Sequence, residues 1–242
     1  MVLNTWNARL CGLAALVGAS ILSARSASAA TVIDAFDSPE KPGPAYLITT
    51  LNQAAPITIS NTMTGLTHVI GGDRTVDMTL VSGEGEIQTD INRYEAGVTT
   101  INSTDGVIGT FAFKYGFGPA GVLNANLSGD NAFVMDFADA DQAGGVLTLF
   151  VTSGAGSDSA VTQNASVAIP LGGGKLAIHF SALSGINFAD VDQLAFSITG
   201  PKSYDATIDN FATAVPLPSA AWAGLALLGT LGVNRIRKAR NA

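Results

Sequence analysis

Aspartates are the residues of this 242-residue chain whose type and spacing most clearly suggest chemistry. Asp136, Asp139 and Asp141 lie close together in the run Asp-Phe-Ala-Asp-Ala-Asp. Calcium prefers several oxygen ligands, and closely spaced carboxylates can supply them. The run lacks the central glycine and the distal glutamate of an EF-hand loop, so a solvated acidic turn is the alternative.

A second candidate metal site combines residues from the two ends of the central region. Asp34 and Asp37 lie near its beginning and Asp209 lies near its end. If the strands that carry them are neighbours, their carboxylates could hold a structural calcium ion. Loss of thermal stability on adding EDTA would indicate such a site, whereas a melting curve indifferent to EDTA would count against both calcium sites.

Residues for other kinds of catalysis are scarce. His68 and His179 are the only histidines, and neither stands in a zinc-ligand spacing. The chain has one cysteine, Cys11, and no Gly-x-Ser-x-Gly elbow or phosphate-binding Gly-Lys-Ser/Thr loop. We therefore predict that the protein is not an enzyme and needs no cofactor beyond a possible structural calcium. A pair of carboxylates for glycoside hydrolysis remains the less favoured alternative, because such pairs meet only in space.

Charge is concentrated in the region 31–214. It holds all 19 acidic residues and six basic ones, which leaves a charge of −13, whereas the whole chain carries −7. A surface this acidic repels phosphate backbones. We expect no nucleic-acid partner, and we expect cations or neutral polar ligands, such as a polysaccharide, if the region binds a ligand at all.

The elements that must position these residues have the periodicity of strands. Apolar and polar residues alternate in many short runs, and glycine-rich turns separate them. This pattern predicts an all-β fold for region 31–214, an antiparallel β-sandwich of the jelly-roll type. The predicted strands are 57–60, 75–81, 110–115, 133–137, 146–151, 176–180, 194–198 and 206–211.

The first and last strand-like runs carry a resemblance to a known group of domains. The opening Val32-Ile33-Asp34-Ala35-Phe36-Asp37 and the closing Ala206-Thr207-Ile208-Asp209-Asn210-Phe211 resemble the edges of galactose-binding-like and carbohydrate-binding-module jelly rolls. The resemblance implies that the two ends of the domain lie together, often beside a calcium ion. It covers few residues and identifies no ligand.

Residues 1–30 have the form of a secretory signal peptide. Arg9 supplies the positive start, residues 10–22 form an apolar run, and Ala27, Ala29 and Ala30 provide the small residues of a cleavage site. Removal of this segment would take away the single cysteine, Cys11. The mature protein would then have no disulfide, so its stability must come from a hydrophobic core.

Residues 215–242 combine three physical parts. Val215, Pro216, Leu217 and Pro218 exclude a helix, and the apolar run 219–233 that follows is a single predicted transmembrane helix, short for a bilayer. A basic cluster ends the chain, and the positive-inside rule predicts that this C-terminus lies in the cytoplasm and that the region before Pro216 lies outside. The cluster consists of Arg235, Arg237, Lys238 and Arg240.

This tail resembles the PEP-CTERM sorting signal, although Leu217 stands where the name-giving motif has glutamate. The resemblance implies an exosortase-type processing enzyme as a partner and transient anchoring in the inner membrane of a Gram-negative bacterium. Export to the cell surface or extracellular matrix would follow. An ordinary tail anchor or a buried helix is the alternative.

The sequence therefore predicts a secreted, surface-sorted, non-catalytic protein associated with an exopolysaccharide or biofilm matrix. A carbohydrate- or calcium-binding jelly-roll module is the alternative, and a glycoside hydrolase is less favoured. Composition and periodicity do not identify the ligand.

Overall fold

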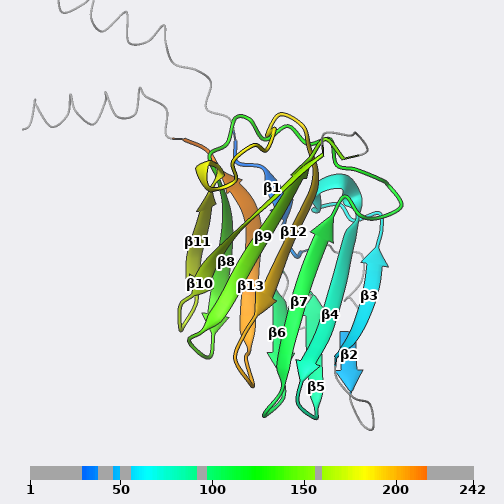
Figure 1. Ribbon diagram of the computed structural model, residues 1–242, viewed down its shortest axis with the longest axis vertical. Helices are drawn as coiled ribbons and strands as arrows, with labels where there is room; N and C mark the ends of the chain where they lie inside the picture. Colours follow the sequence, from blue (N-terminus) through cyan, green and yellow to red (C-terminus); the bar gives the residue numbers. More distant parts are fainter. Residues whose placement is uncertain (1–28, 38–45, 50–55, 92–96, 156–159, 217–242) are drawn as a thin grey trace, which may run out of the picture. The chain divides into compact units, whose positions relative to one another are not determined.

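Two antiparallel β-sheets pack face to face in the computed structural model, which describes residues 29–37, 46–49, 56–91, 97–155 and 160–216 (Figure 1). The seven-stranded sheet has the order β11-β8-β13-β6-β5-β2, and β1 pairs with β13 beside this path. Its strands are β1 (Val32–Asp34), β2 (Tyr46–Thr49), β5 (Glu86–Ile91), β6 (Thr99–Ser103), β8 (Ala132–Ala140), β11 (Gly174–His179) and β13 (Ala206–Ala214).

The second sheet has six strands in the order β10-β9-β12-β7-β4-β3. From β4 onward the chain repeatedly crosses between the two sheets, so each sheet mixes strands from distant parts of the sequence. Its strands are β3 (Ile57–Met63), β4 (Arg74–Ser82), β7 (Ile108–Tyr115), β9 (Gly145–Ser153), β10 (Val161–Ile169) and β12 (Val191–Thr199).

The prediction of an all-β antiparallel sandwich is confirmed. Among the described residues the only helical segments are two short 3-10 turns, η1 (Ile70–Gly72) and η2 (Phe180–Ala182). The predicted neighbourhood of the first and last strands is also confirmed, because Val32 of β1 pairs with Ala212 of β13. Residues 30–214 form one compact unit.

Each predicted strand corresponds to a strand of the structure, but four strands were missed, the predicted runs are shorter than the strands they match, and one run extends past its strand. The run 176–180 was expected to include Phe180, whereas β11 ends at His179 and Phe180 begins η2. The missed strand β10 has Gln163 and Asn164 among small residues, so its sequence lacks a clear apolar alternation. The other missed strands are β2, β5 and β6.

The core between the sheets is rich in phenylalanine. Phe113 of β7 stacks on Phe196 of β12 with ring centroids 4.7 Å apart, and Phe196 meets Phe211 of β13 edge to face at 5.2 Å. All three side chains are buried. These contacts join the six-stranded sheet to the seven-stranded one, so the alternation of β7, β12 and β13 directly produces the sandwich.

The outer face of the six-stranded sheet carries pairs of hydroxyl side chains across neighbouring strands. Thr110 of β7 and Thr199 of β12 are hydrogen-bonded at 2.9 Å, and Thr58 of β3 and Thr79 of β4 make the same contact at 2.9 Å. Such cross-strand pairs stabilise the sheet and fix its register. Further pairs join Thr62 to Thr75, Thr148 to Ser166 and Thr152 to Thr162.

The two predicted targeting segments lie almost entirely outside the described residues. Of the signal peptide only Ala29 and Ala30 are described, and of the sorting signal only Val215 and Pro216. Within the described part, no helix has the length and apolar character needed to cross a membrane. The predicted helix at 219–233 and the basic cluster lie outside the described residues.

Candidate functional site

A polar groove lies on the outer side of the seven-stranded sheet. Its volume is about 350 Å³, at the lower end of the roughly 300 to 1,000 Å³ typical of small-ligand sites. The groove runs over the adjacent strands β5, β6, β13 and β8, which belong to the rear sheet in the view of Figure 1. Its lining consists of Gln88, Asp90, Thr100, Asn102, Asp139, Asp141, Asp205, Ala206 and Thr207.

Strand alternation places these side chains in the groove. In β5, Ile87, Thr89 and Ile91 are buried on the core side, so Gln88 and Asp90 point to the opposite face. Asn102 of β6 is exposed between the buried residues Ile101 and Ser103. The groove therefore consists of outward-facing polar positions on strands whose inward-facing positions form part of the core.

Hydrogen bonds hold the carboxylates at one end of the groove. The backbone amide of Asp205 donates to Asp141 Oδ1 at 2.9 Å, and the amide of Ser103 donates to Asp205 Oδ1 at 3.1 Å. Gln142 Nε2 donates to Asp141 Oδ2 at 3.3 Å and to the carbonyl of Ser203 at 2.5 Å. The loop before β13 is thereby tied to the ends of β6 and β8.

The electrostatics at this end follow from burial and from like charge. Burial raises the pKa of Asp205 above its ordinary value, and the neighbouring charge of Asp141 raises it further, while the hydrogen bond from Ser103 lowers it. Burial, with a smaller contribution from Asp141, raises the pKa of Tyr204 to about 12. Two neighbouring acids in a groove, one with a raised pKa, are a feature that catalytic and ligand-binding sites share.

The predicted acidic run is divided between two places. Asp139 and Asp141 line the groove, together with Asp90 and Asp205 from other strands. Asp136 is not in that lining; its carboxylate lies 3.3 Å from the ammonium group of Lys175 on β11. The structure thus brings two of the three aspartates into a shared site and pairs the third with a cation.

Asp34 lies in a buried ion-pair network between the sheets. Nη1 of Arg74, on β4, donates to both carboxylate oxygens at 2.8 and 2.7 Å, and the Tyr115 hydroxyl donates to Oδ2 at 2.8 Å. The amide of Phe36 donates to Oδ1 at 2.9 Å. Burial raises the pKa of Asp34, and Arg74 and the other donors act in the opposite direction. Every oxygen of this carboxylate therefore has a protein partner.

The other two members of the predicted calcium site lie elsewhere. Oδ1 of Asp37 is 2.7 Å from Nδ1 of His68, and Asp209 is an exposed residue of β13. Among the described residues, no group of three or more histidine, cysteine, aspartate or glutamate side chains is arranged to hold a metal ion. The structural calcium stays a prediction, and in this structure Asp34 has Arg74 as its cationic partner.

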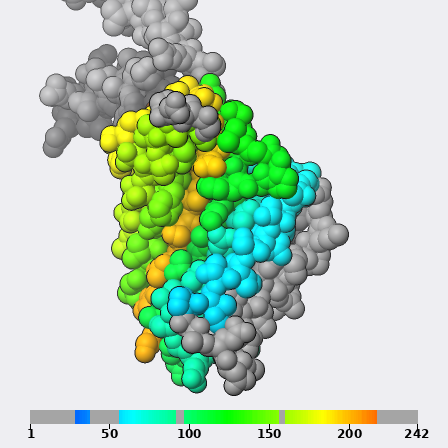
Figure 2. Space-filling view, turned by 45° about the vertical axis from the view of Figure 1, so that its right-hand side comes forward, coloured from blue at the N-terminus to red at the C-terminus, as the bar shows by residue number. Residues whose placement is uncertain are grey.

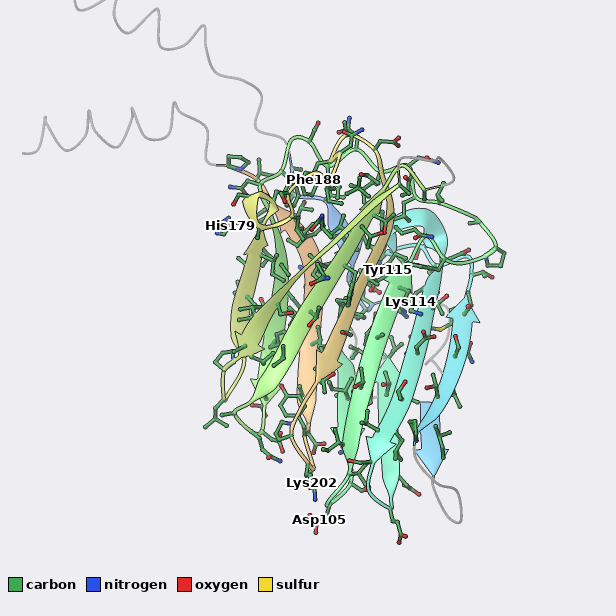
Figure 3. The ribbon with its side chains drawn as sticks, viewed as in Figure 1. Asp105, Lys114, Tyr115, His179, Phe188 and Lys202 are labelled. Atoms are coloured by element: carbon green, nitrogen blue, oxygen red, sulfur yellow. The ribbon has the colours of Figure 1, made fainter. Side chains whose placement is uncertain are left out.

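Sequence reasoning missed Arg74 and the residues from β5 and β6. Extending the alternation of Val76, Met78 and Leu80 by one step places Arg74 on the buried face of β4, which was the available signal. Gln88 and Asn102 had no such signal, because the strands that carry them were not predicted. Tyr115, seen in Figure 3 beside its outward-facing neighbour Lys114, cannot serve as a platform for a sugar ring, because its side chain is fully buried.

Aromatic platforms are missing from the described lining of the groove. Tyr204 is buried like Tyr115, the side chain of Tyr46 is not described, and Tyr94 lies outside the described residues. Phe188, labelled in Figure 3, stacks on Phe180 with centroids 3.9 Å apart at one end of the sandwich. The described lining of the groove therefore offers a ligand hydrogen-bonding groups and no aromatic ring.

Comparison with known proteins found no matching family model and no matching curated protein. Among solved structures, a family 11 carbohydrate-binding module from Clostridium thermocellum, in complex with a β-1,3-1,4-mixed-linked tetrasaccharide, aligns with 14% identity and a TM-score of 0.38. The alignment covers 72% of this chain and 97% of that one. A carbohydrate-binding module in complex with β-1,4-galactotriose aligns with 9% identity and a TM-score of 0.33, covering 78% and 100% of the two chains.

An exo-β-agarase aligns with 11% identity and a TM-score of 0.40, over 78% of this chain and 25% of the enzyme. These identities and scores are low, so the ligand of this chain has to be inferred from its own groove. Fold and site together define an antiparallel β-sandwich with an acidic, hydrogen-bonding groove on one sheet.

Proposed function

We propose that this protein is an exported, non-catalytic β-sandwich that binds a neutral glycan in the groove of its seven-stranded sheet. The observation that carries the proposal is the lining of the groove, which offers amide, hydroxyl and carboxylate groups and no lysine or arginine. Carboxylates accept hydrogen bonds from ligand hydroxyls, and amides both donate and accept. A neutral polyhydroxylated ligand satisfies such groups without bringing a second negative charge.

The charge of the region supports the same class of ligand. Region 31–214 carries −13, and Asp90, Asp139, Asp141 and Asp205 lie in the groove itself. An anionic polysaccharide or a phosphate group would be repelled. Because no aromatic platform is described in the groove, we expect weaker binding than stacking would give, with selectivity from hydrogen-bond geometry.

Residues 30–214 expressed alone and applied to a glycan array would test the proposal. Asn102→Ala and Asp139→Asn should each weaken binding of the best glycan at least about tenfold, because the first removes an exposed amide from the lining and the second replaces an exposed carboxylate acceptor with an NH2 donor. Asn61→Ala is the matched control, since it removes an exposed amide from β3 of the other sheet. Binding unaffected by both groove variants, or no binding to any neutral glycan, would contradict the proposal.

Export and sorting complete the proposed function. Their support is the signal-peptide pattern of residues 1–30 and the Pro-x-Pro, apolar run and basic cluster of residues 215–242. We infer that an exosortase-type enzyme processes the tail and that the sandwich then belongs to the cell surface or the polysaccharide matrix.

A glycoside hydrolase is the second candidate, and one observation favours it. Burial and the neighbouring charge of Asp141 raise the pKa of the Asp205 carboxyl at the end of the groove, and a general acid of a glycosidase needs a raised pKa and a second carboxylate nearby. Release of reducing ends from an array-positive glycan, abolished by Asp205→Asn, would replace the non-catalytic assignment. Unchanged glycan after prolonged incubation would support binding alone.

A further inference from the structure

The four edge strands of the two sheets, β11, β2, β10 and β3, differ in how well they are protected against pairing with another chain. An edge strand exposes unpaired backbone amides and carbonyls, and proteins usually guard it with charged residues, proline or a short length. β2 has four residues and β11 has six, including Lys175, which is exposed. β3 has seven residues and begins directly after Pro56.

β10 is the longest of these edge strands, and the described residues show none of the usual protection on it. Its nine residues pair with β9 in one uninterrupted register, from Val161 opposite Ser153 to Ile169 opposite Gly145, without a bulge. No charged residue occurs between Ala160 and Gly174, and the first proline follows the strand at Pro170. In Figure 2 the yellow-green strands β9 and β10 form one side of the visible face.

Apolar side chains are exposed near this edge. Val146 and Phe150, on the neighbouring strand β9, are 39% and 37% exposed, and Leu171, just after β10, is 65% exposed. On β10 itself, Ala165 and Val167 pack against the core but remain only half-buried, because no strand lies beyond them. A partner strand beside β10 would cover the exposed sides of Ala165 and Val167.

Two copies of β10 can pair with each other along their full length in an antiparallel arrangement. Ala165 is the middle residue, so pairing two copies about Ala165 engages all nine residues of each strand. Asn164 then faces Ser166 of the second copy on the outer face, and Val161 faces Ile169 on the inner face. Thr162 faces Ala168 and Gln163 faces Val167, so core-facing positions meet core-facing ones and outer positions meet outer ones, as in an isologous two-fold interface.

We propose that β10 is a self-association edge, at which two copies of this protein pair antiparallel about Ala165 and join their six-stranded sheets into one continuous sheet. The occupant is a second copy because antiparallel pairing about Ala165 engages the whole of both strands and because two acidic bodies can approach most easily along an uncharged edge. Higher ionic strength should strengthen the dimer, since it screens the repulsion between the two bodies. The inference is independent of the glycan groove, which lies on the other sheet.

Cysteine cross-linking of the full-length chain tests the register. In a Cys11→Ser background, Ala165→Cys places two thiols directly opposite each other, at a Cα separation of about 4.5 to 5.5 Å, within the range of a disulfide. The expected result is a disulfide-linked dimer on a non-reducing gel after mild oxidation. Asn61→Cys, on the opposite edge strand β3, is the matched control and should stay monomeric. Equal cross-linking at both positions, or none at Ala165, would overturn the proposal.

A charge-swap experiment separates loss of pairing from misfolding. Two differently tagged full-length chains that both carry Ala165→Lys, or both carry Ala165→Glu, should lose at least about tenfold of the co-capture seen for the unsubstituted chains, because like charges meet across the two-fold axis. Co-expression of the Lys variant with the Glu variant should restore capture. Failure of the mixed pair to recover, or unchanged capture of the like-charged pairs, would count against β10 as the interface.

Discussion

Arg74 and Asp34 show how one buried ion pair organises several elements. They join β4 to β1, Tyr115 of β7 adds a third strand, and the Arg74 guanidinium also lies 5.6 Å from the centroid of the Phe36 ring. Nε of Arg74 has no hydrogen-bond partner among the described residues. Both oxygens of the Asp34 carboxylate therefore accept hydrogen bonds, whereas the guanidinium of Arg74 leaves one donor without an acceptor among the described residues.

Removing one partner of this pair should be far more costly than removing both. Arg74→Met leaves the Asp34 carboxylate buried without its cation, and we expect a loss of about 3 to 5 kcal/mol in the free energy of unfolding. The double variant Asp34→Leu/Arg74→Met should recover much of that loss, because it buries no charge. Urea unfolding of both variants measures the difference, and equal destabilisation by the two would contradict this reading of the network.

Tyr204 provides a titration that reports on the end of the groove. Its pKa is raised to about 12, whereas an unfolded tyrosine ionises near 10. Between these pH values the folded protein binds more protons than the unfolded chain, so stability should fall as the pH rises through this window.

Tyr204→Phe should flatten this part of the stability profile, measured by unfolding at several alkaline pH values. Tyr115, whose pKa is also raised by burial, remains in both proteins and serves as the internal reference. A profile unchanged by the substitution would show that Tyr204 ionises alike in the folded and unfolded states.

At the scale of elements, β7 shows how one strand serves two faces. Phe113 points into the core against Phe36 and Phe196, while Thr110 points outward and pairs with Thr199. The apolar face joins the two sheets and the hydroxyl face fixes the position of neighbouring strands. Alternation therefore predicts different energetic roles for residues only three positions apart.

Substitutions on the two faces of β7 should differ in cost. Phe113→Ala should destabilise the protein by about 3 to 5 kcal/mol, because it removes a fully buried ring and leaves a cavity. Thr110→Ala should cost less than about 1 kcal/mol, the range of a cross-strand pair. Chemical denaturation of the two variants makes the comparison, and similar costs would mean that the hydroxyl pairs stabilise the sheet more than such pairs usually do.

Loops at one end of the sandwich also need specific residues. The Tyr204 ring occupies the space that a Cβ atom would take at Gly145 and at Gly200, so neither position tolerates a larger residue without displacing that ring. At the same end, the hydroxyl of Ser203 accepts from the amide of Gly106 at 2.9 Å and donates to Asp105 at 3.2 Å. Asp105 and Lys202 label these loops in Figure 3.

At the scale of the whole molecule, we propose separate tasks for the central region and the flanking segments. Residues 30–214 form the sandwich, with its termini paired as β1 and β13. The first 30 and the last 28 residues carry the targeting patterns, so that processing at both ends would leave the sandwich essentially intact. Retention of β1 and β13 matters because both belong to the seven-stranded sheet.

Processing can be checked by intact-mass spectrometry of the protein from the surface fraction of a Gram-negative host that has an exosortase system. We expect a chain that begins after Ala29 or Ala30 and lacks the apolar run 219–233. Pro216→Ala/Pro218→Ala should accumulate the membrane-bound precursor, because it removes the helix-excluding motif before the apolar run. A mature protein that keeps the full tail, or recovery of the untrimmed chain in the cytoplasm, would contradict the sorting prediction.

The sequence by itself determined the all-β class, the position of most strands and the nearness of the first and last ones. The class and the strand positions follow from local alternation and glycine-rich turns, which depend on short stretches of chain, whereas the nearness of the first and last strands was implied by the resemblance to carbohydrate-binding-module jelly rolls. It did not reveal β10 as an edge, because Gln163 and Asn164 interrupt the apolar pattern that a strand on a core would show.

Only the tertiary structure decided which polar residues meet. Asp34 is close to Arg74 because β4 faces β1 across the sandwich, and Asp139 shares a groove with Asn102 because β13 lies between β8 and β6. Residues so far apart in the sequence are brought together by strand order and sheet stacking. No local pattern encodes that order, since it results from the free energy of packing the whole core.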